Sequence, residues 1–138
     1  MNSTQRTGYS GKPLYQKLGL KEEQNITVLN APTDYESWLE APFSVDTHDP
    51  KALFDVIHMF SDDRGELRSM LTDYLPRLQQ NGMIWVSWPK KASKVPTNVT
   101  EDVVRAEVFP LGLVDVKVCS VNPVWSGLKV VIRKENRK

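Results

Sequence analysis

Short apolar runs separated by amphipathic segments make up most of the chain. Three of these runs predict buried strands: 26–29 (ITVL), 52–60 (ALFDVIHMF) and 83–88 (MIWVSW). All three contain β-branched or aromatic residues and lie between Asn, Gly, Pro or Ser residues, as buried strands usually do. The middle run is apolar on both faces, which is typical of a parallel strand with helices on both sides.

Segments with helical spacing lie between the apolar runs. Residues 13–18 form the first predicted helix, because Pro13 suits a first turn and Gly19 suits a C-terminal stop. A second helix is predicted after Thr33, which forms a capping box with Glu36. The alternation of helices and strands favours a parallel sheet with right-handed crossovers.

The longest helical pattern follows the central apolar run. Residues 61–63 (Ser-Asp-Asp) can cap its start, and Asn81–Gly82 is expected to end it. Apolar residues recur in it at spacings of three and four, which indicates an amphipathic helix. They are Leu67, Met70, Leu71, Tyr74, Leu75 and Leu78. Pro76 is expected to kink this helix or to split it in two.

The last third of the chain predicts one helix and two strands. Thr100 can cap a helix that Pro110 and Gly112 end. Residues 113–121 alternate valine with polar or small side chains, and 128–134 is the last strand-like run. The link between these two strands is too short for a crossover, so they are expected to pair antiparallel.

Together these elements predict an α/β protein with a three-layer, Rossmann-like architecture. We expect a mostly parallel sheet of about six strands, which includes a weak strand at 43–47, and a C-terminal antiparallel hairpin. The length of 138 residues suggests a single domain. This domain is predicted over 10–134, between a flexible N-terminus (1–9) and a basic tail (135–138).

Composition argues against several classes of function. The net charge is +1, so no overall field draws the protein to nucleic acid or to membranes. No apolar run reaches the roughly 18 residues of a membrane span. The first twelve residues are polar and contain no signal-peptide segment, and Cys119 is the only cysteine, so no internal disulfide can form. We therefore expect a cytoplasmic protein without a membrane or nucleic-acid partner.

The order of elements over 52–134 is a strand, a long helix, a strand, a helix and a closing antiparallel hairpin. This order resembles the second half of the class I S-adenosylmethionine methyltransferase fold, and it implies a shortened version of that fold. Methyltransferases follow their first strand with a glycine-rich turn, whereas this chain reads LNAPTDYE from residue 29. Pro32 removes an amide donor there, and Asp46 is only a weak candidate for the acid that would hold the cofactor ribose. S-adenosylmethionine is therefore a possible but disfavoured cofactor.

A second resemblance covers nearly the whole chain. The segments that carry it are GYSGKPL (8–14), KLG (17–19), LNAP (29–32), WPKKAS (88–93), TEDVVR (100–105), GLVDVKVCSV (112–121) and WSGLK (125–129). These segments resemble a family of small bacterial proteins that is catalogued as domain of unknown function 3052. That family has no assigned activity, so the resemblance implies neither a substrate nor a site.

Polar, cationic and aromatic residues follow the carboxyl ends of the predicted parallel strands. Ligands of open α/β sheets bind in the crevice beyond these ends, so we expect one rim that binds an anionic ligand. The candidate residues of this rim are Asn30, Arg64, Trp88, Lys90, Lys91, Ser93, Asn122 and Trp125. Ammonium groups suit a phosphate or carboxylate, and the tryptophans could stack a flat ligand such as a base. The lysines also fit a solvated loop and the tryptophans also fit a core, and both interpretations stay open.

Other reactive residues have simpler interpretations. His58 lies inside the central strand and is expected to be a hydrogen-bonded core residue. His48 lies beside two aspartates, but no second histidine is near in the sequence, so no metal site is predicted. Cys119 is interpreted as a small core residue. The segment 10–13 (SGKP) lacks the preceding strand and the spacing of a phosphate loop.

Three functions remain open. The first is a non-catalytic binding or regulatory module that holds an anionic small molecule or a protein at the rim. The second is a divergent S-adenosylmethionine-dependent methyltransferase. The third is a structural or interaction protein that forms a homodimer through a sheet edge or an apolar helical surface. The sequence contains no complete catalytic constellation, so no catalytic residue is predicted and the first function is favoured.

Overall fold

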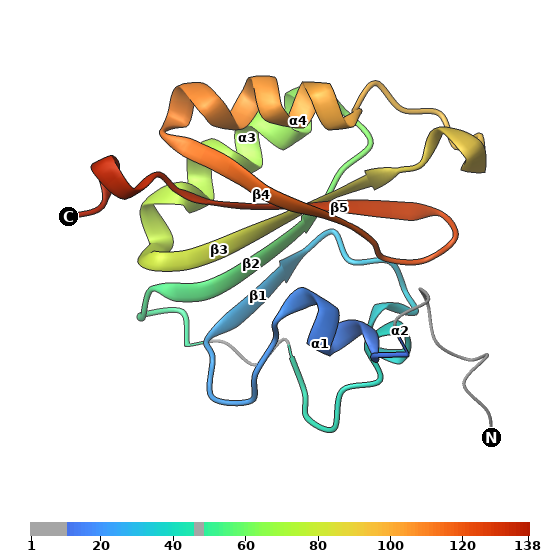
Figure 1. Ribbon diagram of the computed structural model, residues 1–138, viewed down its shortest axis with the longest axis horizontal. Coiled ribbons are helices and arrows are strands. Elements are labelled where there is room, and N and C mark those ends of the chain that lie inside the picture. Colours follow the sequence, from blue (N-terminus) through green and yellow to red (C-terminus); the bar gives the residue numbers. More distant parts are fainter. Residues whose placement is uncertain (1–10, 46–48) are drawn as a thin grey trace.

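The protein, described here by a computed structural model over residues 11–45 and 49–138, is built on one five-stranded sheet. The strands lie in the order β1-β2-β3-β5-β4. Their bounds are β1 Ile26–Leu29, β2 Phe54–Phe60, β3 Leu78–Pro89, β4 Leu113–Ser120 and β5 Trp125–Ile132. Figure 1 shows this sheet between two helical layers. The three strongest apolar runs of the sequence therefore became β1, β2 and β3.

The sheet is mixed. β1, β2 and β3 pair in parallel, whereas β5 pairs antiparallel with both β3 and β4. β4 therefore runs in the same direction as the first three strands, and the predicted C-terminal hairpin is confirmed. The expectation of about six mostly parallel strands was wrong. The expected extra strand does not form at 43–45, and residues 46 and 47 lie outside the described residues.

Two helices cover each face of the sheet (Figure 1). One face packs against α1 (Leu14–Leu18) and α2 (Tyr35–Leu39), and the other packs against α3 (Arg64–Tyr74) and α4 (Glu101–Val108). In the core on the α1 side, Trp85 is fully buried and its indole Nε1 donates a hydrogen bond of 2.9 Å to the carbonyl of Leu18. The predicted three-layer α/β architecture is therefore present.

Helix α3 starts where the sequence predicted and ends earlier. The Asp63 carboxylate accepts a hydrogen bond of 3.0 Å from the amide of Glu66, which confirms the predicted cap. A 3₁₀ turn at Leu75–Arg77, which contains Pro76, ends the helix. The prediction that Asn81–Gly82 ends this helix was wrong, because these residues lie inside β3. Proline cannot continue a helix, and the apolar Leu78 that fitted the helical stripe begins the strand instead.

One further prediction at an element end needs correction. The capping box of Thr33 and Glu36 does not form, because α2 begins after Asp34 and no side chain caps it. The segment predicted as a basic tail, 135–138, follows β5 and overlaps a 3₁₀ turn at Lys134–Asn136. The start of the predicted domain at residue 10 lies outside the described residues. The remaining 3₁₀ turns are Lys91–Ser93 and Phe109–Leu111.

The N-cap of α4 is confirmed, and it supports a first prediction. The Thr100 hydroxyl accepts a hydrogen bond of 3.2 Å from the amide of Val103. Thr100→Ala should lower the free energy of unfolding by about 1 kcal/mol in urea titrations, because one amide of the first turn loses its partner. The control is Thr72→Ala, since the Thr72 hydroxyl donates within α3 to the carbonyl of Arg68 and is exposed. Equal losses in both variants would contradict this role of Thr100.

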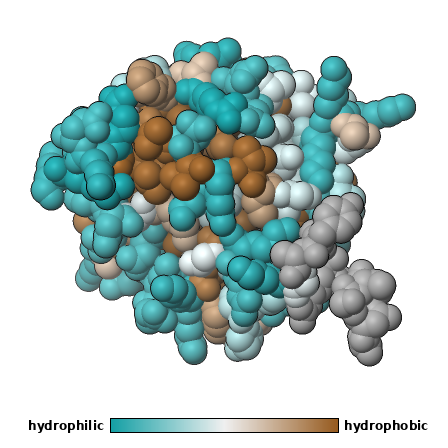
Figure 2. Space-filling model, viewed as in Figure 1, coloured by the Kyte–Doolittle hydropathy of each residue, from teal (hydrophilic) through white to brown (hydrophobic). Residues whose placement is uncertain are grey.

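The outer edge of the sheet carries exposed apolar side chains. Val116 and Val118 on the edge strand β4 are 52% and 48% exposed. Figure 2, in the same view as Figure 1, shows hydrophobic atoms gathered where β4 and β5 face the viewer, with hydrophilic atoms around them. A register shift between Asp115 and Lys117 distorts this strand. A bulge and a lysine at an edge both oppose pairing with another strand.

None of the helices among the described residues combines the length and the apolar character that would let it cross a lipid bilayer.

Candidate functional site

The carboxyl ends of β1, β2, β3 and β4 point to the same edge of the sheet, because these strands run in the same direction. The loops that follow them hold the residues that the sequence singled out. Figure 1 shows the arrowheads of the first three strands at this edge. These residues form one site only if their side chains point toward one another.

Asn30 directly follows β1, and its side chain contacts the end of β2. Its backbone has a φ of 57°, a left-handed conformation that Asn adopts more readily than most residues. Its side-chain Nδ2 donates to the carbonyl of Phe60 at 3.3 Å and lies 3.6 Å from the sulfur of Met70. The amide of Asn30 therefore ties the ends of two strands together, at the position where a methyltransferase-like fold is expected to carry glycines.

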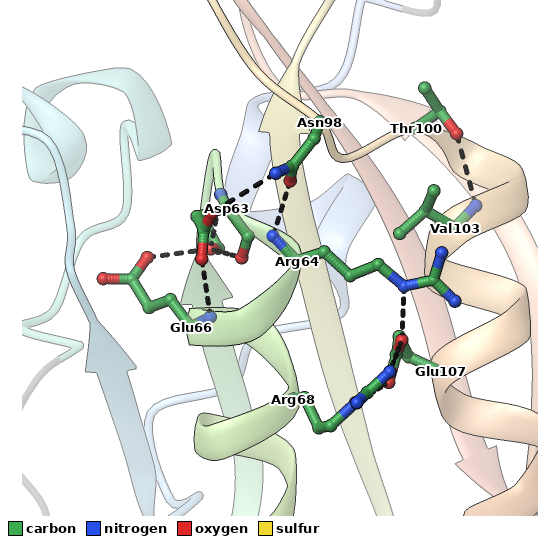
Figure 3. Close-up of polar contacts among 9 residues, drawn as sticks. Asp63, Arg64, Glu66, Arg68, Asn98, Thr100, Val103 and Glu107 are labelled. Carbon is green, nitrogen blue, oxygen red and sulfur yellow. Dashed lines mark hydrogen bonds and ion pairs between the residues drawn. The ribbon is translucent and has the colours of Figure 1, made fainter.

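The loop after β2 and the start of α3 are bound by Asn98 from the loop before α4 (Figure 3). The Asn98 Oδ1 accepts a hydrogen bond of 2.6 Å from the amide of Arg64, and its Nδ2 donates to Asp63 at 3.2 Å. The amide of Glu66, followed by the Asn98 side chain, lowers the pKa of Asp63. Side chains of the protein itself therefore satisfy these groups at the start of α3.

The Arg64 side chain leaves the rim and reaches α4. Its Nε donates to Glu107 at 2.5 Å, while Arg68 donates to both oxygens of the same carboxylate at 2.8 Å (Figure 3). Hydrogen bonds from Arg68, and then from Arg64, lower the pKa of Glu107 to about 2 although burial opposes the shift. We call Arg64, Arg68 and Glu107 the arginine–glutamate cluster, and it joins α3 to α4.

Sequence reasoning missed Glu107, although a signal for it exists. Glu107 lies three and four residues after Val104 and Val103, and directly before Val108, so a carboxylate falls within the apolar stripe of α4. An acid in such a stripe must be paired or it would cost free energy on burial. Arg64 and Arg68, four residues apart on α3, are its partners.

The two tryptophans of the predicted rim lie on opposite faces of the sheet. Trp88 is 6% exposed and belongs to the core on the α3–α4 side. Trp125 packs against the core on the α1–α2 side, with its ring centroid 5.1 Å from that of Phe60. β3 and β5 pair Pro89 with Trp125, and Trp88 with the next residue, so adjacent positions point to opposite faces. The rings therefore do not flank one ligand position.

The lysine loop after β3 is ordered by its own hydrogen bonds. The Lys90 amide donates to the carbonyl of Val124 at 2.7 Å, and its Nζ donates to the Ser120 hydroxyl at 2.7 Å. The Ser93 hydroxyl donates to the carbonyl of Lys90 at 2.6 Å. Lys91 is exposed, and Lys94 adopts a left-handed φ of 62°. This loop therefore holds its ammonium groups at the edge of the sheet, beside the β4–β5 turn.

Asn122 builds the turn between β4 and β5. It is 8% exposed, and its Oδ1 accepts hydrogen bonds from the amides of Val124 at 2.9 Å and Trp125 at 2.8 Å. Because the Lys90 amide binds the carbonyl of Val124, Asn122 also positions the lysine loop indirectly. The structure thus brings together Lys90, Lys91, Ser93 and Asn122, while Asn30, Arg64 and Trp88 are held in contacts elsewhere.

His58 is a hydrogen-bonded core residue, as predicted. It is fully buried in β2, with its Nδ1 2.8 Å from the Tyr35 hydroxyl and its Nε2 2.8 Å from the Ser87 hydroxyl. Burial lowers the pKa of His58 to about 3, so the ring is neutral at physiological pH. Both ring nitrogens are used inside the protein, so His58 has no free nitrogen to offer a substrate.

The remaining candidates are residues of metal-binding types and the thiol of Cys119. No group of three or more His, Cys, Asp or Glu side chains is gathered there for a metal ion. His48 and Asp46, which the sequence raised, lie outside the described residues. Cys119 is buried, as predicted, and burial raises the pKa of its thiol. The thiol of Cys119 is therefore protonated at neutral pH.

The fold is similar to that of several methyltransferases. A SAM dependent methyltransferase from Aquifex aeolicus matches with a TM-score of 0.61 and 16% identity, over 87% of this chain and 88% of that chain. The magnesium protoporphyrin IX methyltransferase ChlM from Synechocystis PCC 6803, solved with bound SAM, matches with a TM-score of 0.58 and 9% identity, over 87% and 74%. LepI, solved in complex with SAM, matches with a TM-score of 0.54 and 10% identity, and the match covers 39% of its length. Identities this low establish the fold alone.

The sequence itself places the chain in a family. No curated protein matches it. A family model does match residues 16–134, and its description is "Protein of unknown function (DUF3052)". The resemblance that the short sequence segments suggested is confirmed over most of the chain. The protein therefore belongs to the DUF3052 family, on a methyltransferase-like α/β fold.

Proposed function

We propose that the protein is a non-catalytic binding module, and that it holds an anionic group of a small molecule or protein at the lysine loop. The ammonium groups of Lys90, Lys91 and Lys94 carry this proposal. Within the part of the chain that the structure describes, none of them forms an ion pair with a carboxylate. Among the described residues, the Lys90 ammonium group binds only the neutral hydroxyl of Ser120, so it keeps donors for an anion.

The contacts at the other loops of this edge support a role other than cofactor binding. Asn98 binds the first amide of α3, and Asn30 binds the end of β2. A dinucleotide or S-adenosylmethionine site on such a fold uses backbone amides at these loops. Two asparagine side chains hold these loops together instead, so the lysine loop is the better candidate for ligand contact.

Five residues of the predicted rim take part in the proposed site. Lys90 and Lys91 contact the anion, while Ser93 and Asn122 hold the two loops that present the lysines. Trp125 is half-buried beside this turn and offers an apolar surface next to the anion. Arg64 and Trp88 have structural roles, because the former binds Glu107 and the latter is a core residue.

The test is a thermal-shift screen with inorganic phosphate, pyrophosphate, glucose 6-phosphate, ATP and S-adenosylmethionine. An anion at 100 times its dissociation constant should stabilise the protein by about 2.7 kcal/mol. Lys90→Ala combined with Lys91→Ala should abolish this shift. Lys21→Ala combined with Lys51→Ala is the matched control, since both residues are exposed and the change in net charge is the same. Equal loss of binding in both double variants would reduce the proposal to a general charge effect and refute it.

A divergent methyltransferase is the second candidate, and the likeness of the fold to SAM-dependent enzymes favours it. This candidate requires S-adenosylmethionine to bind at micromolar concentrations. Calorimetry with the cofactor at millimolar concentration tests it. We expect no heat of binding, because Asn30 and Asn98 hold the loops at which the cofactor would bind. A saturable signal would make this candidate the better one.

The exposed valines of β4 favour a third candidate, a homodimer. Val116 and Val118 would be covered by a second copy through side-chain contacts. Sedimentation velocity at high protein concentration decides this candidate. A dimer that Val116→Lys dissociates would support it, and a monomer at all concentrations would exclude it.

A further inference from the structure

A pocket of about 230 Å³ lies at the opposite end of the parallel strands from the lysine loop. Its lining comes from the loop before β1, the starts of β2 and β3, and the far part of β5. The polar lining residues are Gln24, Asp55, Asn81 and Lys129, and the apolar ones are Met83 and Val131. It shares no lining residue with the lysine loop, so it is independent of the proposed function.

An irregularity of the sheet forms this pocket. Phe54 pairs with Leu78, whereas Val56 pairs with Met83, so residues 79–82 of β3 stand opposite Asp55 alone. Asp55 and Asn81 lie at this irregularity, and both line the pocket. Gly82 permits the irregularity, because a Cβ at this position would lie 2.9 Å from the carbonyl oxygen of Asp55. Bulges of this kind are frequent next to ligand sites, where they redirect side chains.

Two residues of opposite charge, Asp55 and Lys129, line the pocket. The Asp55 carboxylate accepts one hydrogen bond, of 2.7 Å, from the amide of Asn25. Neither Asp55 nor Lys129 forms an ion pair with any residue in 11–45 or 49–138, and they do not pair with each other. A ligand that carries both an ammonium group and a carboxylate would satisfy both side chains at once.

The size and the floor of the pocket narrow the class of ligand. Pockets for drug-sized ligands are usually about 300–1,000 Å³, so this one suits a smaller molecule. Met83 belongs to the core on the α1 side, Val131 packs against this core, and both contribute apolar lining to the pocket. We propose that the pocket binds a small apolar amino acid, with its carboxylate on Lys129, its ammonium group on Asp55 and its side chain against Met83 and Val131.

The test is a titration of the ¹⁵N-labelled full chain, followed by amide chemical shifts. L-Leucine, L-methionine and L-valine are the probes, and 3-methylbutylamine and 4-methylpentanoate are the leucine analogues that lack one charge. At least one amino acid should cause saturable shifts at Asp55, Asn81 and Met83. Each analogue should bind at least about tenfold more weakly than leucine, because one ion pair is lost.

Two substitutions distinguish amino acid binding in this pocket from a general effect of surface charge. Lys129→Met should weaken amino acid binding by about tenfold or more, whereas Lys117→Met should not. Lys117 is the matched control, because it pairs directly with Lys129 on the neighbouring strand but does not line the pocket. Absence of saturable shifts with all three amino acids would overturn the proposal. So would equal binding of the single-charge analogues in the unchanged protein, a result that does not depend on whether a variant folds.

Discussion

The free energy of unfolding should fall by about 2 kcal/mol between pH 7 and pH 5, and His58 should cause most of this loss. The ring of His58 is fully buried between the Tyr35 and Ser87 hydroxyls, and burial lowers its pKa to about 3. In the unfolded chain the same ring takes up a proton near pH 6.5. Between these two values only the unfolded state binds the proton, so stability falls by about 1.4 kcal/mol per pH unit.

Urea titrations at pH 7, 6 and 5 measure this effect. His58→Gln removes the titrating group and keeps a polar side chain, so its stability should be lower at pH 7 but nearly constant down to pH 5. His48→Gln replaces the other histidine of the sequence and should keep the full pH dependence of the unchanged protein. If His58→Gln leaves the pH dependence intact, the neutral buried ring is the wrong explanation. Histidine NMR shifts give a second test, since the His58 ring should remain neutral at pH 5.

Glu107→Gln should lower the free energy of unfolding by about 2 kcal/mol at pH 7. The Glu107 side chain is 6% exposed and binds both arginines of the arginine–glutamate cluster. Removing its charge leaves Arg64 and Arg68 without a counter-charge. Breaking a fully buried pair costs about 3–5 kcal/mol, but these arginine side chains are 43% and 66% exposed, so water compensates in part.

The control for this prediction lies on the same helix. Glu101 pairs with Arg105 four residues later, and their side chains are 40% and 39% exposed. Glu101→Gln should therefore lower the free energy of unfolding by only about 0.5 kcal/mol, as the loss of an exposed pair on one helix does.

Low pH should destabilise the protein in the same way as the Glu107 substitution, because it removes the charge of the same carboxylate. The pKa of Glu107 is lowered to about 2, so its stabilising effect is complete above pH 4.5 and is lost as pH falls toward 2. Equal losses in the two variants would show that the cluster does not hold α3 to α4.

Periodicity predicted most of the elements of this fold, because burial on one or two faces leaves a direct trace in the sequence. β2 is apolar on both faces and α4 has a cap and a stripe, so both were found. The end of α3 was misplaced because Leu78 fits a helical stripe and a buried strand equally well. Only the pairing of Leu78 with Phe54 decides between the two, and this pairing is a long-range contact.

The candidate site was harder to predict than the fold, because it depends on register and side-chain direction. The sequence places Trp88 and Trp125 correctly at the edge formed by the carboxyl ends of the parallel strands. The β3–β5 register, however, directs their side chains to opposite faces of the sheet. The sequence also gives no sign that Asn98 would reach α3 across 34 residues. The long bulge opposite Asp55 is likewise a product of two strands, and neither strand encodes it alone.

The placement of ligands at this edge of the sheet distinguishes the competing functions most directly. The structure has the fold of methyltransferases, yet Asn30 and Asn98 bind the loops where their cofactor would lie. The lysines at the end of β3 form no ion pair with any of the described residues. The decisive measurement is an amide chemical-shift titration of the unchanged protein, with pyrophosphate in one series and S-adenosylmethionine in the other. We expect pyrophosphate to cause saturable shifts at Lys90, Lys91 and Ser120, and S-adenosylmethionine to cause none. Saturable shifts at Asn30 and Asn98 with S-adenosylmethionine would contradict the proposed binding module and restore the methyltransferase.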